Sequence, residues 1–333
     1  MIAPRFWRRE RPGLVARALS PLGALYGAAT AARMSRQGEK VSAPVVCVGN
    51  FVVGGAGKTP TAIAIAKLLQ SAGERVAFLS RGYGGAGRSE PLLVDPLVHG
   101  ARLVGDEPML LARVAPCFVG ADRVASARAA IEAGASVLVM DDGLQNPALR
   151  KDLSFAVVDG EARFGNGLSF PAGPLRAPLA VQSRFTDAMI VIGGGGDAVR
   201  SVESAAPGRP VFRAWLQPDA MVSSGLVGRS VLAFAGIARP EKFFASLASI
   251  GAGVAASRVF ADHHMFSPRE IERLIAEASA RDLILVTTEK DLVRIAPAYA
   301  EEVVALPVTL TFEEPPAVRR LLATTAASRA PRR

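Results

Sequence analysis

The chain has 333 residues, half of them hydrophobic, with few aromatic side chains and a formal net charge of +9. This length allows two domains of ordinary size, and the hydrophobic content excludes a disordered chain. The two cysteines, Cys47 and Cys117, lie inside apolar runs, which indicates buried strand thiols rather than a disulfide or a metal pair. The positive charge requires an anionic partner. Since no stretch interleaves basic and aromatic residues, we expect no nucleic acid.

The N-terminal segment is first basic and then apolar, with arginines in 5–11 followed by the run at 14–33. A signal peptide would export the nucleotide loop described below to a place without ATP. A membrane span takes ~20 apolar residues, whereas only 15 uncharged residues separate the two arginines of the run. Two interpretations stay open: a membrane-surface segment with Phe6 and Trp7 at the headgroup level, or a helix packed on the domain.

From residue 44 to residue 160, apolar runs alternate with segments of helical spacing. We predict strands at 44–51, 115–120, 135–143 and 153–160, a strand followed by a glycine loop at 75–85, and helices at 60–73, 107–115 and 124–134. This alternation is typical of βαβ units, and continuous apolar runs fit parallel strands buried on both faces. The predicted fold class is therefore α/β, a P-loop NTPase-like parallel sheet flanked by helices.

A second, smaller α/β domain is predicted after a Gly/Pro-rich loop at 164–179 and a strand that enters a glycine turn at 187–198. The turn lacks a following Lys-Thr pair, so we expect a linker rather than a second nucleotide site. The segments of the smaller domain are 230–252, 256–278 and 281–295, followed by a final strand at 303–312.

The stretch GNFVVGGAGKTP at 49–60 lies between a predicted strand and a predicted helix, which is the context of a phosphate-binding P-loop. Backbone N–H groups would surround the phosphates, Lys58 would reach the β/γ oxygens, and the Thr59 hydroxyl would bind Mg²⁺. The start is irregular, because Val52 stands where the common pattern has glycine and a β-branched residue disfavours positive φ. We expect the loop to enter differently from the common form. The predicted nucleotide-binding residues are Val52, Val53, Gly54, Gly55, Ala56, Gly57, Lys58 and Thr59.

The apolar run VLVMDDG ends in Asp141 and Asp142, the Walker B arrangement, in which a carboxylate holds Mg²⁺ directly or through water. Transfer to a hydroxyl also needs a proton acceptor. Two of the three histidines, His263 and His264, lie in FADHHMF, where an adjacent aspartate can orient the ring. A solvated loop or a metal site are the alternatives there. By itself, Asp106 in LVGDEPML is more simply a helix cap.

Taken together, these motifs resemble those of one known family. VGNFVVGGAGKTPT, SRGYGG, VGDEPMLLA, DRVASA, VMDDGLQN, PAGPLRAPL, DHHMFS and VTTEKDLVRI occur in the order found in the tetraacyldisaccharide 4′-kinases. The resemblance covers most of the chain and includes the FW…LSPLGALYG start. Members of this family transfer the γ-phosphate of ATP to the 4′-hydroxyl of an acylated glucosamine disaccharide 1-phosphate in lipid A biosynthesis.

The resemblance implies ATP and Mg²⁺ as cofactors and a peripheral position at the cytoplasmic face of the inner membrane, reached through the N-terminal segment. It implies that Asp106 and His263 form an acid–base dyad, although the residues alone leave the choice between the two histidines open. Oligomeric state stays undetermined. The implied metal ligands are Thr59, Asp141 and Asp142, and the implied substrate-binding residues are Arg81, Tyr83, Arg123 and Gln145.

The expected organisation has four parts: a membrane-associating segment (1–35), a P-loop kinase domain (36–190), a C-terminal α/β domain (191–325) and a basic tail (326–333). Departures from the family pattern are Leu144, Asn146 and Ala177, the last of which stands where glutamate is usual. If that glutamate helps to bind Mg²⁺ or to position ATP, its role is lost here or is taken over by another acid, for example Glu161. The Mg²⁺ dependence of Ala177→Glu tests this hypothesis.

Two rival functions stay open. A P-loop GTPase or metallochaperone-type switch would need a guanine-specificity motif, for which TEKD at 288–291 is the nearest match. A cytosolic kinase of a small metabolite would leave the N-terminal segment without a role.

Overall fold

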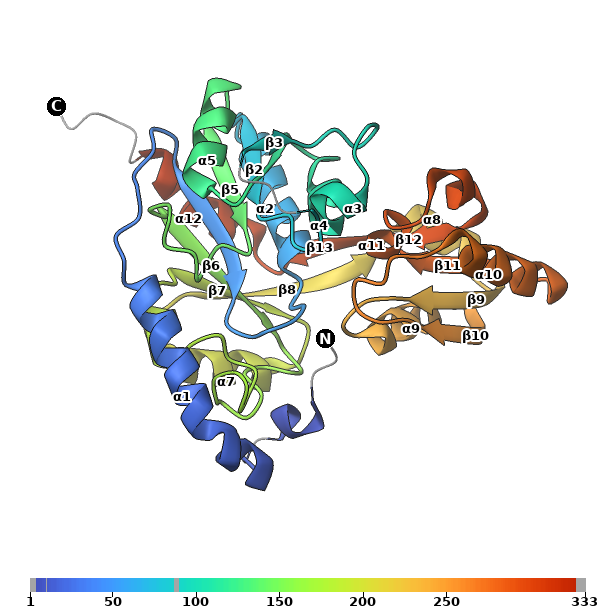
Figure 1. Ribbon diagram of the computed structural model, residues 1–333, viewed down its shortest axis with the longest axis horizontal. Helices are drawn as coiled ribbons and strands as arrows, with labels where there is room; N and C mark the ends of the chain where they lie inside the picture. The colour runs from blue at the N-terminus through green and yellow to red at the C-terminus, as the bar shows by residue number, and fades with distance from the viewer. Residues whose placement is uncertain (1–3, 10, 87–89, 328–333) are drawn as a thin grey trace.

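The computed structural model describes residues 4–9, 11–86 and 90–327, and within them the strands form two sheets. Figure 1 shows a large unit on the left and a smaller unit on the right. The large sheet has the order β13-β8-β7-β6-β1-β5-β2-β4-β3. Its strands are β1 (Val45–Asn50), β2 (Val76–Ser80), β3 (Leu92–Leu93), β4 (Cys117–Val119), β5 (Val137–Asp141), β6 (Leu153–Asp159), β7 (Ala188–Ile192), β8 (Val211–Pro218) and β13 (Val308–Phe312).

Every neighbouring pair in this sheet is parallel except the edge pairs β3–β4 and β8–β13. β1 lies between β5 and β6 and is buried at all its positions, as are both cysteines, Cys47 and Cys117. The carboxyl ends of parallel strands meet at one edge of a sheet, where ligands bind in open α/β folds. The loops after β1, β2 and β5 therefore gather there. The predicted α/β fold class is confirmed.

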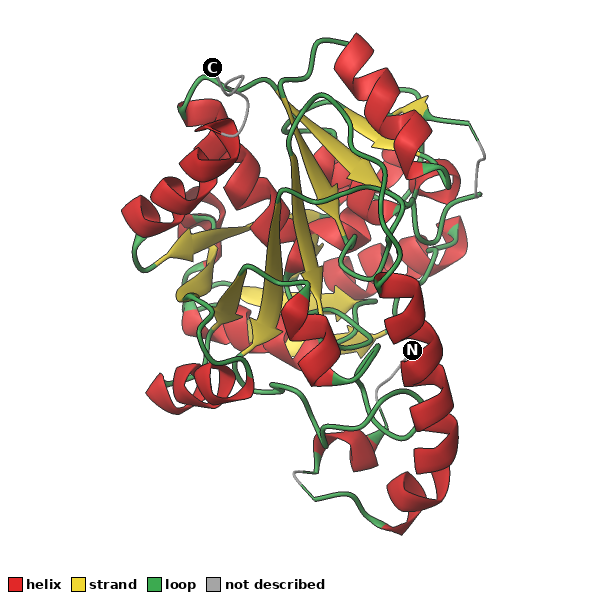
Figure 2. Cartoon of the chain, turned by 90° about the vertical axis from the view of Figure 1, so that its left-hand side faces the viewer, coloured by secondary structure: helices red, strands yellow, loops and turns green. Residues whose placement is uncertain are grey.

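Helices cover both faces of the large sheet, as Figure 2 shows. On one face, Ile65 and Leu69 of α2 share a core cluster with Leu310 of β13 and Leu322 of α12. A second cluster on the other face includes Phe51, Leu144 and Leu175. The helices of this unit are α1 (Leu14–Met34), α2 (Lys58–Ser71), α3 (Ala101–Val104), α4 (Asp106–Leu111), α5 (Arg123–Glu132), α6 (Leu179–Arg184), α7 (Gly196–Ala205) and α12 (Pro315–Ala327), with a 3-10 turn at Arg5–Arg8.

The smaller unit is built on a parallel sheet of order β10-β9-β11-β12. Its strands are β9 (Ser230–Ala235), β10 (Gly253–Val259), β11 (Ile284–Thr288) and β12 (Val304–Leu306). Its helices are α8 (Ala220–Leu226), α9 (Pro240–Ser249), α10 (Pro268–Ala280) and α11 (Glu289–Leu292), with a 3-10 turn at Pro297–Glu302.

The segment predicted as one strand at 303–312 is two strands in different sheets. Pro307, which has no N–H to donate to a ladder, separates β12 from β13. Sheet membership therefore groups the chain differently from a division at 190–191, because α7, β8, β13 and α12 lie with the large sheet. The smaller unit is an insertion between β8 and β13. Of the expected basic tail, residues 328–333 lie outside the described residues.

The N-terminal helix α1 packs on the large unit through one face. Its buried residues include Gly23 and Gly27, whose backbone approaches Ser169 of the Gly/Pro-rich loop. Trp7 is only 4% exposed, and its indole N–H donates to the carbonyl of Pro171. The expectation of Trp7 at the lipid headgroups was therefore wrong, because the loop at 164–179 covers this ring.

The opposite face of α1 is exposed and apolar. Its exposed side chains include Leu14, Leu22 and Leu25, which are 85%, 57% and 70% exposed. Among the described residues, no helix combines the length and the apolar character needed to cross a membrane. The two interpretations of this segment are thus compatible, since a helix packed on one face can present the other to a surface.

Gly23→Val is expected to lower the free energy of unfolding by about 1–3 kcal/mol, because the added side chain overpacks the contact. A Cβ at this position would lie 2.7 Å from the carbonyl oxygen of Ser169. Urea unfolding followed by fluorescence measures the loss. Ala24→Val, at an exposed neighbouring position, is the control, and an equal loss in both variants would contradict close packing at Gly23.

Candidate active site

The loop that connects β1 to α2 begins as an extended segment. Val52 forms a bridge with Leu175, and the Val53 N–H donates to the carbonyl of Pro174 at 2.7 Å. Positive φ angles occur only later, at Gly54 (108°) and Gly57 (85°). This pairing explains how a valine occupies position 52. It also occupies the Val53 amide, so the free amides of the loop start after this residue.

Lys58 and Thr59 open α2 and are almost fully buried. The Lys58 ammonium donates to the carbonyl of Gly54 at 3.3 Å, so it curls over its own loop. The Thr59 hydroxyl donates to Oδ2 of Asp141 at 3.3 Å, which joins the loop to the end of β5.

Asp141 is 2% exposed, and its Oδ1 is buried without a hydrogen-bond partner among the described residues. Burial, together with the negative charges of Glu107 and Asp142, raises the pKa of Asp141 to about 7. An orphaned, buried carboxylate oxygen is unusual in folded proteins. Its presence beside a threonine hydroxyl indicates a position for a cation with a preference for oxygen ligands. The described residues contain no cluster of three or more His, Cys, Asp or Glu side chains suited to a metal.

Asp142 has a different environment, although it is the next residue. Both its oxygens accept hydrogen bonds from Arg176, at 2.9 and 3.0 Å, and Lys58 lies 3.9 Å away. Burial acts to raise the pKa of Asp142, but Lys58 and Arg176 outweigh it and hold this pKa below its usual range. The same guanidinium donates to the carbonyl of Val52 at 3.0 Å. Asp142 thus fixes Arg176 against the phosphate loop, and its oxygens are already engaged.

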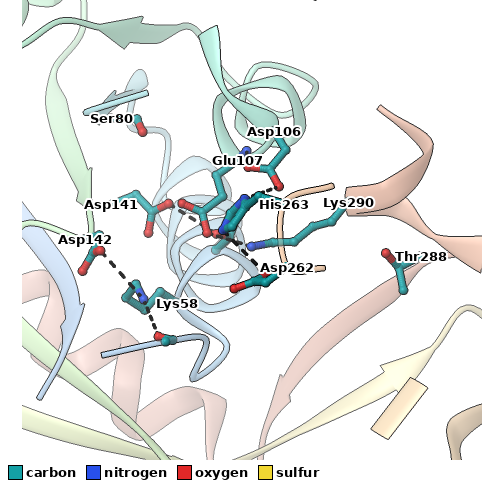
Figure 3. Close-up of polar contacts among 12 residues, drawn as sticks. Lys58, Ser80, Asp106, Glu107, Asp141, Asp142, Asp262, His263, Thr288 and Lys290 are labelled. Atoms are coloured by element: carbon teal, nitrogen blue, oxygen red, sulfur yellow. Dashed lines mark hydrogen bonds and ion pairs between the residues drawn. The ribbon is translucent and has the colours of Figure 1, made fainter. Parts of the chain in front are cut away.

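Asp106 and His263 come from different units and point toward one another (Figure 3). His263 Nδ1 lies 3.1 Å from Oδ2 of Asp106, and its Nε2 lies 3.8 Å from Asp262. Burial acts to raise the pKa of Asp106, but the hydrogen bond from His263 and the charges of Lys290 and Arg294 hold it well below its usual range. Asp106 therefore stays anionic.

His264 points away from this pair. Its Nε2 lies 3.1 Å from Glu270, and its ring stacks on Phe260 at 5.0 Å between centroids. Glu270 closes the capping box of α10 with Ser267, as the pattern SPRE predicts. His264 thus belongs to the local structure of the smaller unit, whereas His263 contacts Asp106 of the large unit.

A cavity of about 1570 Å³ lies between the two units and α1. It is lined by the phosphate loop, Asp141 and His263, while Tyr26 and Arg33 of α1 form another part of its wall. The four predicted substrate-binding residues also line it: Arg81, Tyr83, Arg123 and Gln145.

These four residues differ in what they offer a ligand. Tyr83 is 65% exposed, with its ring 5.3 Å from that of His263. Arg123 is 2% exposed, and its Nε has no partner among the described residues, so a buried donor is available there. Burial and the nearby Arg81 lower the pKa of Arg123 to about 10. The Gln145 amide already bonds Asn50, Gln182 and Arg176.

Comparison with known proteins identifies the family. The sequence profile of the tetraacyldisaccharide-1-P 4′-kinase family matches residues 15–327. A tetraacyldisaccharide 4′-kinase of Methylobacterium sp. (strain 4-46) is 56% identical over 94% of this chain and 93% of the relative. The chain belongs to the tetraacyldisaccharide 4′-kinase family. It is therefore a kinase, a phosphotransferase with an alcohol group as acceptor.

Other relatives support the same family. A tetraacyldisaccharide 4′-kinase of Rhodopseudomonas palustris (strain BisB5) is 51% identical over 97% of this chain and 96% of the relative. Among solved structures, the “apo” form of LpxK from Aquifex aeolicus in complex with ATP superposes with a TM-score of 0.73. It has 26% sequence identity and covers 94% of this chain and 99% of that one.

The TEKD segment of the kinase does not have the contacts of a guanine site. Asp291 is fully buried and accepts hydrogen bonds from Gly236, Thr288 and Arg294. Lys290 pairs with Glu107 at 2.7 Å. Both side chains are thus engaged inside the protein, and the Lys290–Glu107 pair joins the smaller unit to the large unit.

Ala177, where the family usually has glutamate, has no exposed surface and packs in the core cluster with Phe51 and Leu175. Glu161 is 60% exposed and pairs with Arg239, the residue before α9, and with Lys242 of α9. No described contact joins Glu161 to Asp141. The hypothesis that Glu161 replaces the missing acid thus has no support in the geometry, and the Mg²⁺ dependence of Ala177→Glu remains its test.

Four residues of the site were missed at the level of sequence: Glu107, Arg176, Lys290 and Arg294. All four form buried or half-buried ion pairs with partners 34 to 188 positions away: Arg176 with Asp142, Lys290 with Glu107, and Arg294 with Asp106. All four also lie inside the quoted motifs VGDEPMLLA, PAGPLRAPL and VTTEKDLVRI, which was the one available signal.

Proposed function

We propose that this kinase transfers the γ-phosphoryl group of ATP to the 4′-hydroxyl of a tetraacylated glucosamine disaccharide 1-phosphate. One observation carries the proposal: the phosphate loop, His263, which contacts Asp106, and α1 border a single cavity. The names of the relatives and the ATP in the Aquifex aeolicus structure support the substrate pair. In the reaction, the substrate oxygen forms a bond to the γ-phosphorus, the bond from this phosphorus to the bridging oxygen breaks, and ADP leaves.

Proton transfer is assigned to His263. Its Nε2 takes the hydroxyl proton, because Nδ1 already faces the Asp106 carboxylate. Asp106 fixes the tautomer and stabilises the imidazolium that forms, in the manner of other His-Asp pairs. A single general base contributes about 10²–10⁴-fold, so most of the catalysis rests on positioning and on charge stabilisation by Lys58.

The residues fit the Mg²⁺ ion that the family resemblance implies. The orphaned Oδ1 of Asp141 and the hydroxyl of Thr59 are hard oxygen ligands, and they meet at the end of the phosphate loop. We assign these two residues to the ion, and Asp142 to Arg176. When bound, Mg²⁺ would offset negative charge on the phosphates.

We place the kinase at the cytoplasmic face of the inner membrane, held peripherally by α1. The exposed leucines of this helix and the arginines near it suit a surface of anionic lipid. Because the same helix lines the cavity, a lipid substrate can enter from the membrane with its acyl chains beside α1.

The test is incubation with γ-labelled ATP and the disaccharide 1-phosphate in detergent, with GTP in a parallel reaction. Label is expected on the 4′ position with ATP. Product without label at this position would overturn the assigned acceptor. Hydrolysis of GTP that does not depend on lipid would instead favour a nucleotide switch.

A further inference from the structure

Arg294, just after α11, has only 1% of its side chain exposed. Its Nε donates to Oδ2 of Asp106 at 3.0 Å, and its Nη2 donates to the same oxygen. Its Nη1 donates to the carbonyl of Gly236 at 2.8 Å and to Asp291 at 2.9 Å. This buried guanidinium of the smaller unit thus binds one carboxylate of the large unit, and one carbonyl and one carboxylate of the smaller unit.

The Gly236 carbonyl is also the support of His263. It accepts the backbone N–H of His263 at 3.0 Å, where the histidine has a φ of 60°. Positive φ is uncommon for a residue other than glycine and needs support from its surroundings. Arg294 therefore contacts Asp106 directly and His263 through one shared carbonyl.

We propose that Arg294 is a positioning residue for phosphoryl transfer, which fixes the Asp106 carboxylate opposite Nδ1 of His263. The proposal rests on the proposed function of the dyad. A guanidinium is suited to this role because its planar fork can bond three acceptors in fixed directions. The ammonium group of a lysine supplies the positive charge but lacks the planar arrangement of several N–H donors.

Cations and anions surround the pair, and the cations prevail at Asp106. Arg294 and Lys290 face Asp106 as cations, and Glu107 and Asp291 are the anions nearest to them. Asp262 lies on the other side of the His263 ring. With Arg294 in place, Asp106 stays charged and keeps its orientation toward Nδ1 of His263.

The experiment compares wild type, Arg294→Met, Arg294→Lys, Asp106→Asn and the double variant Arg294→Met/Asp106→Asn. Steady-state assays give kcat and KM for ATP, and thermal melting checks folding. Arg213→Met, which removes an arginine of β8 paired with Glu313, controls for loss of an ion pair that includes neither Asp106 nor His263. Arg294→Met is expected to lower kcat by about 10²-fold with KM for ATP little changed, and Arg294→Lys is expected to lie between it and wild type.

The double variant decides whether Arg294 acts through Asp106. We expect its kcat to match that of Asp106→Asn, because the carboxylate that Arg294 positions is then absent. This variant also removes both buried charges together, so it tests the proposal if Arg294→Met alone does not fold. Losses that multiply, or a change in KM alone, would overturn the proposal. A wild-type kcat in Arg294→Met, together with a reduced kcat in Asp106→Asn, would also overturn this proposal but would leave the proposed function intact.

A spectroscopic measurement is independent of turnover. The chain has only three histidines, so the imidazole nitrogen signals of protein labelled with ¹⁵N-histidine can be assigned by substitution. Arg294→Met and Asp106→Asn are expected to shift the signal of His263 and to leave those of His99 and His264 in place. An unmoved His263 signal would overturn the positioning role whether or not the disaccharide is the substrate.

Discussion

Replacing Lys58 by methionine is expected to lower kcat by about 10²–10³-fold or more, the usual loss when one donor to developing charge is removed. The ammonium is 3.3 Å from the carbonyl of Gly54 and buried, so it is held at the loop before nucleotide binds. Asp142 keeps both hydrogen bonds from Arg176 in the variant, and we therefore expect the fold to survive. Steady-state kinetics with ATP and the disaccharide measure the effect.

The control for this variant is Lys40→Met, which removes an exposed lysine before β1. It is expected to leave kcat unchanged. If Lys58→Met retained wild-type kcat, the loop would not stabilise the transferred phosphoryl group. If a lowered melting temperature accounted for the loss of kcat, this result would equally contradict a direct role of Lys58 in the reaction.

His263→Asn should lower kcat by about 10²–10⁴-fold, whereas His264→Asn should stay close to wild type. Asparagine suits the positive φ of position 263 and can still donate to Asp106, but it is not a base. Only the proton acceptor is lost. For His264, the change removes the contact with Glu270 and the ring stacking in the smaller unit.

The two adjacent substitutions are matched controls for each other, because both remove one imidazole from the same loop. Equal losses in kcat would contradict the assignment of the base to His263. Loss in His264→Asn alone would transfer the role to the other histidine. Melting temperatures of both variants separate these outcomes from unfolding.

The local elements of this kinase were predictable because each depends on a short window. Apolar runs predicted the parallel strands, and the pattern SPRE predicted a capping box that the structure confirms. The irregular loop at Val52 needed its partner, because the pairing with Leu175 lies 123 positions away in sequence. A pattern within the loop predicts that its entry is unusual but cannot show what it pairs with.

Long-range ion pairs were beyond the reach of the sequence. Asp106 by itself resembles a helix cap, and nothing near it indicates a guanidinium 188 positions later. The division of 303–312 between two sheets depends on where β8 ends and β13 begins, which is a tertiary property. Trp7 is the clearest case, because an aromatic near arginines fits a lipid interface and a protein core equally well.

The insertion of the smaller unit between β8 and β13 has a consequence for biosynthesis. The helix that follows the phosphate loop shares its core with Leu310, Val318 and Leu322, which are translated after the whole smaller unit. During translation, α2 therefore lacks part of its apolar cover until the smaller unit, β13 and α12 have emerged. β8 is also an open sheet edge for that period, since β13 is its partner. The nucleotide loop is encoded before the smaller unit and its supporting core is completed after that unit, so a product interrupted within the smaller unit would carry the loop without the packing that holds it.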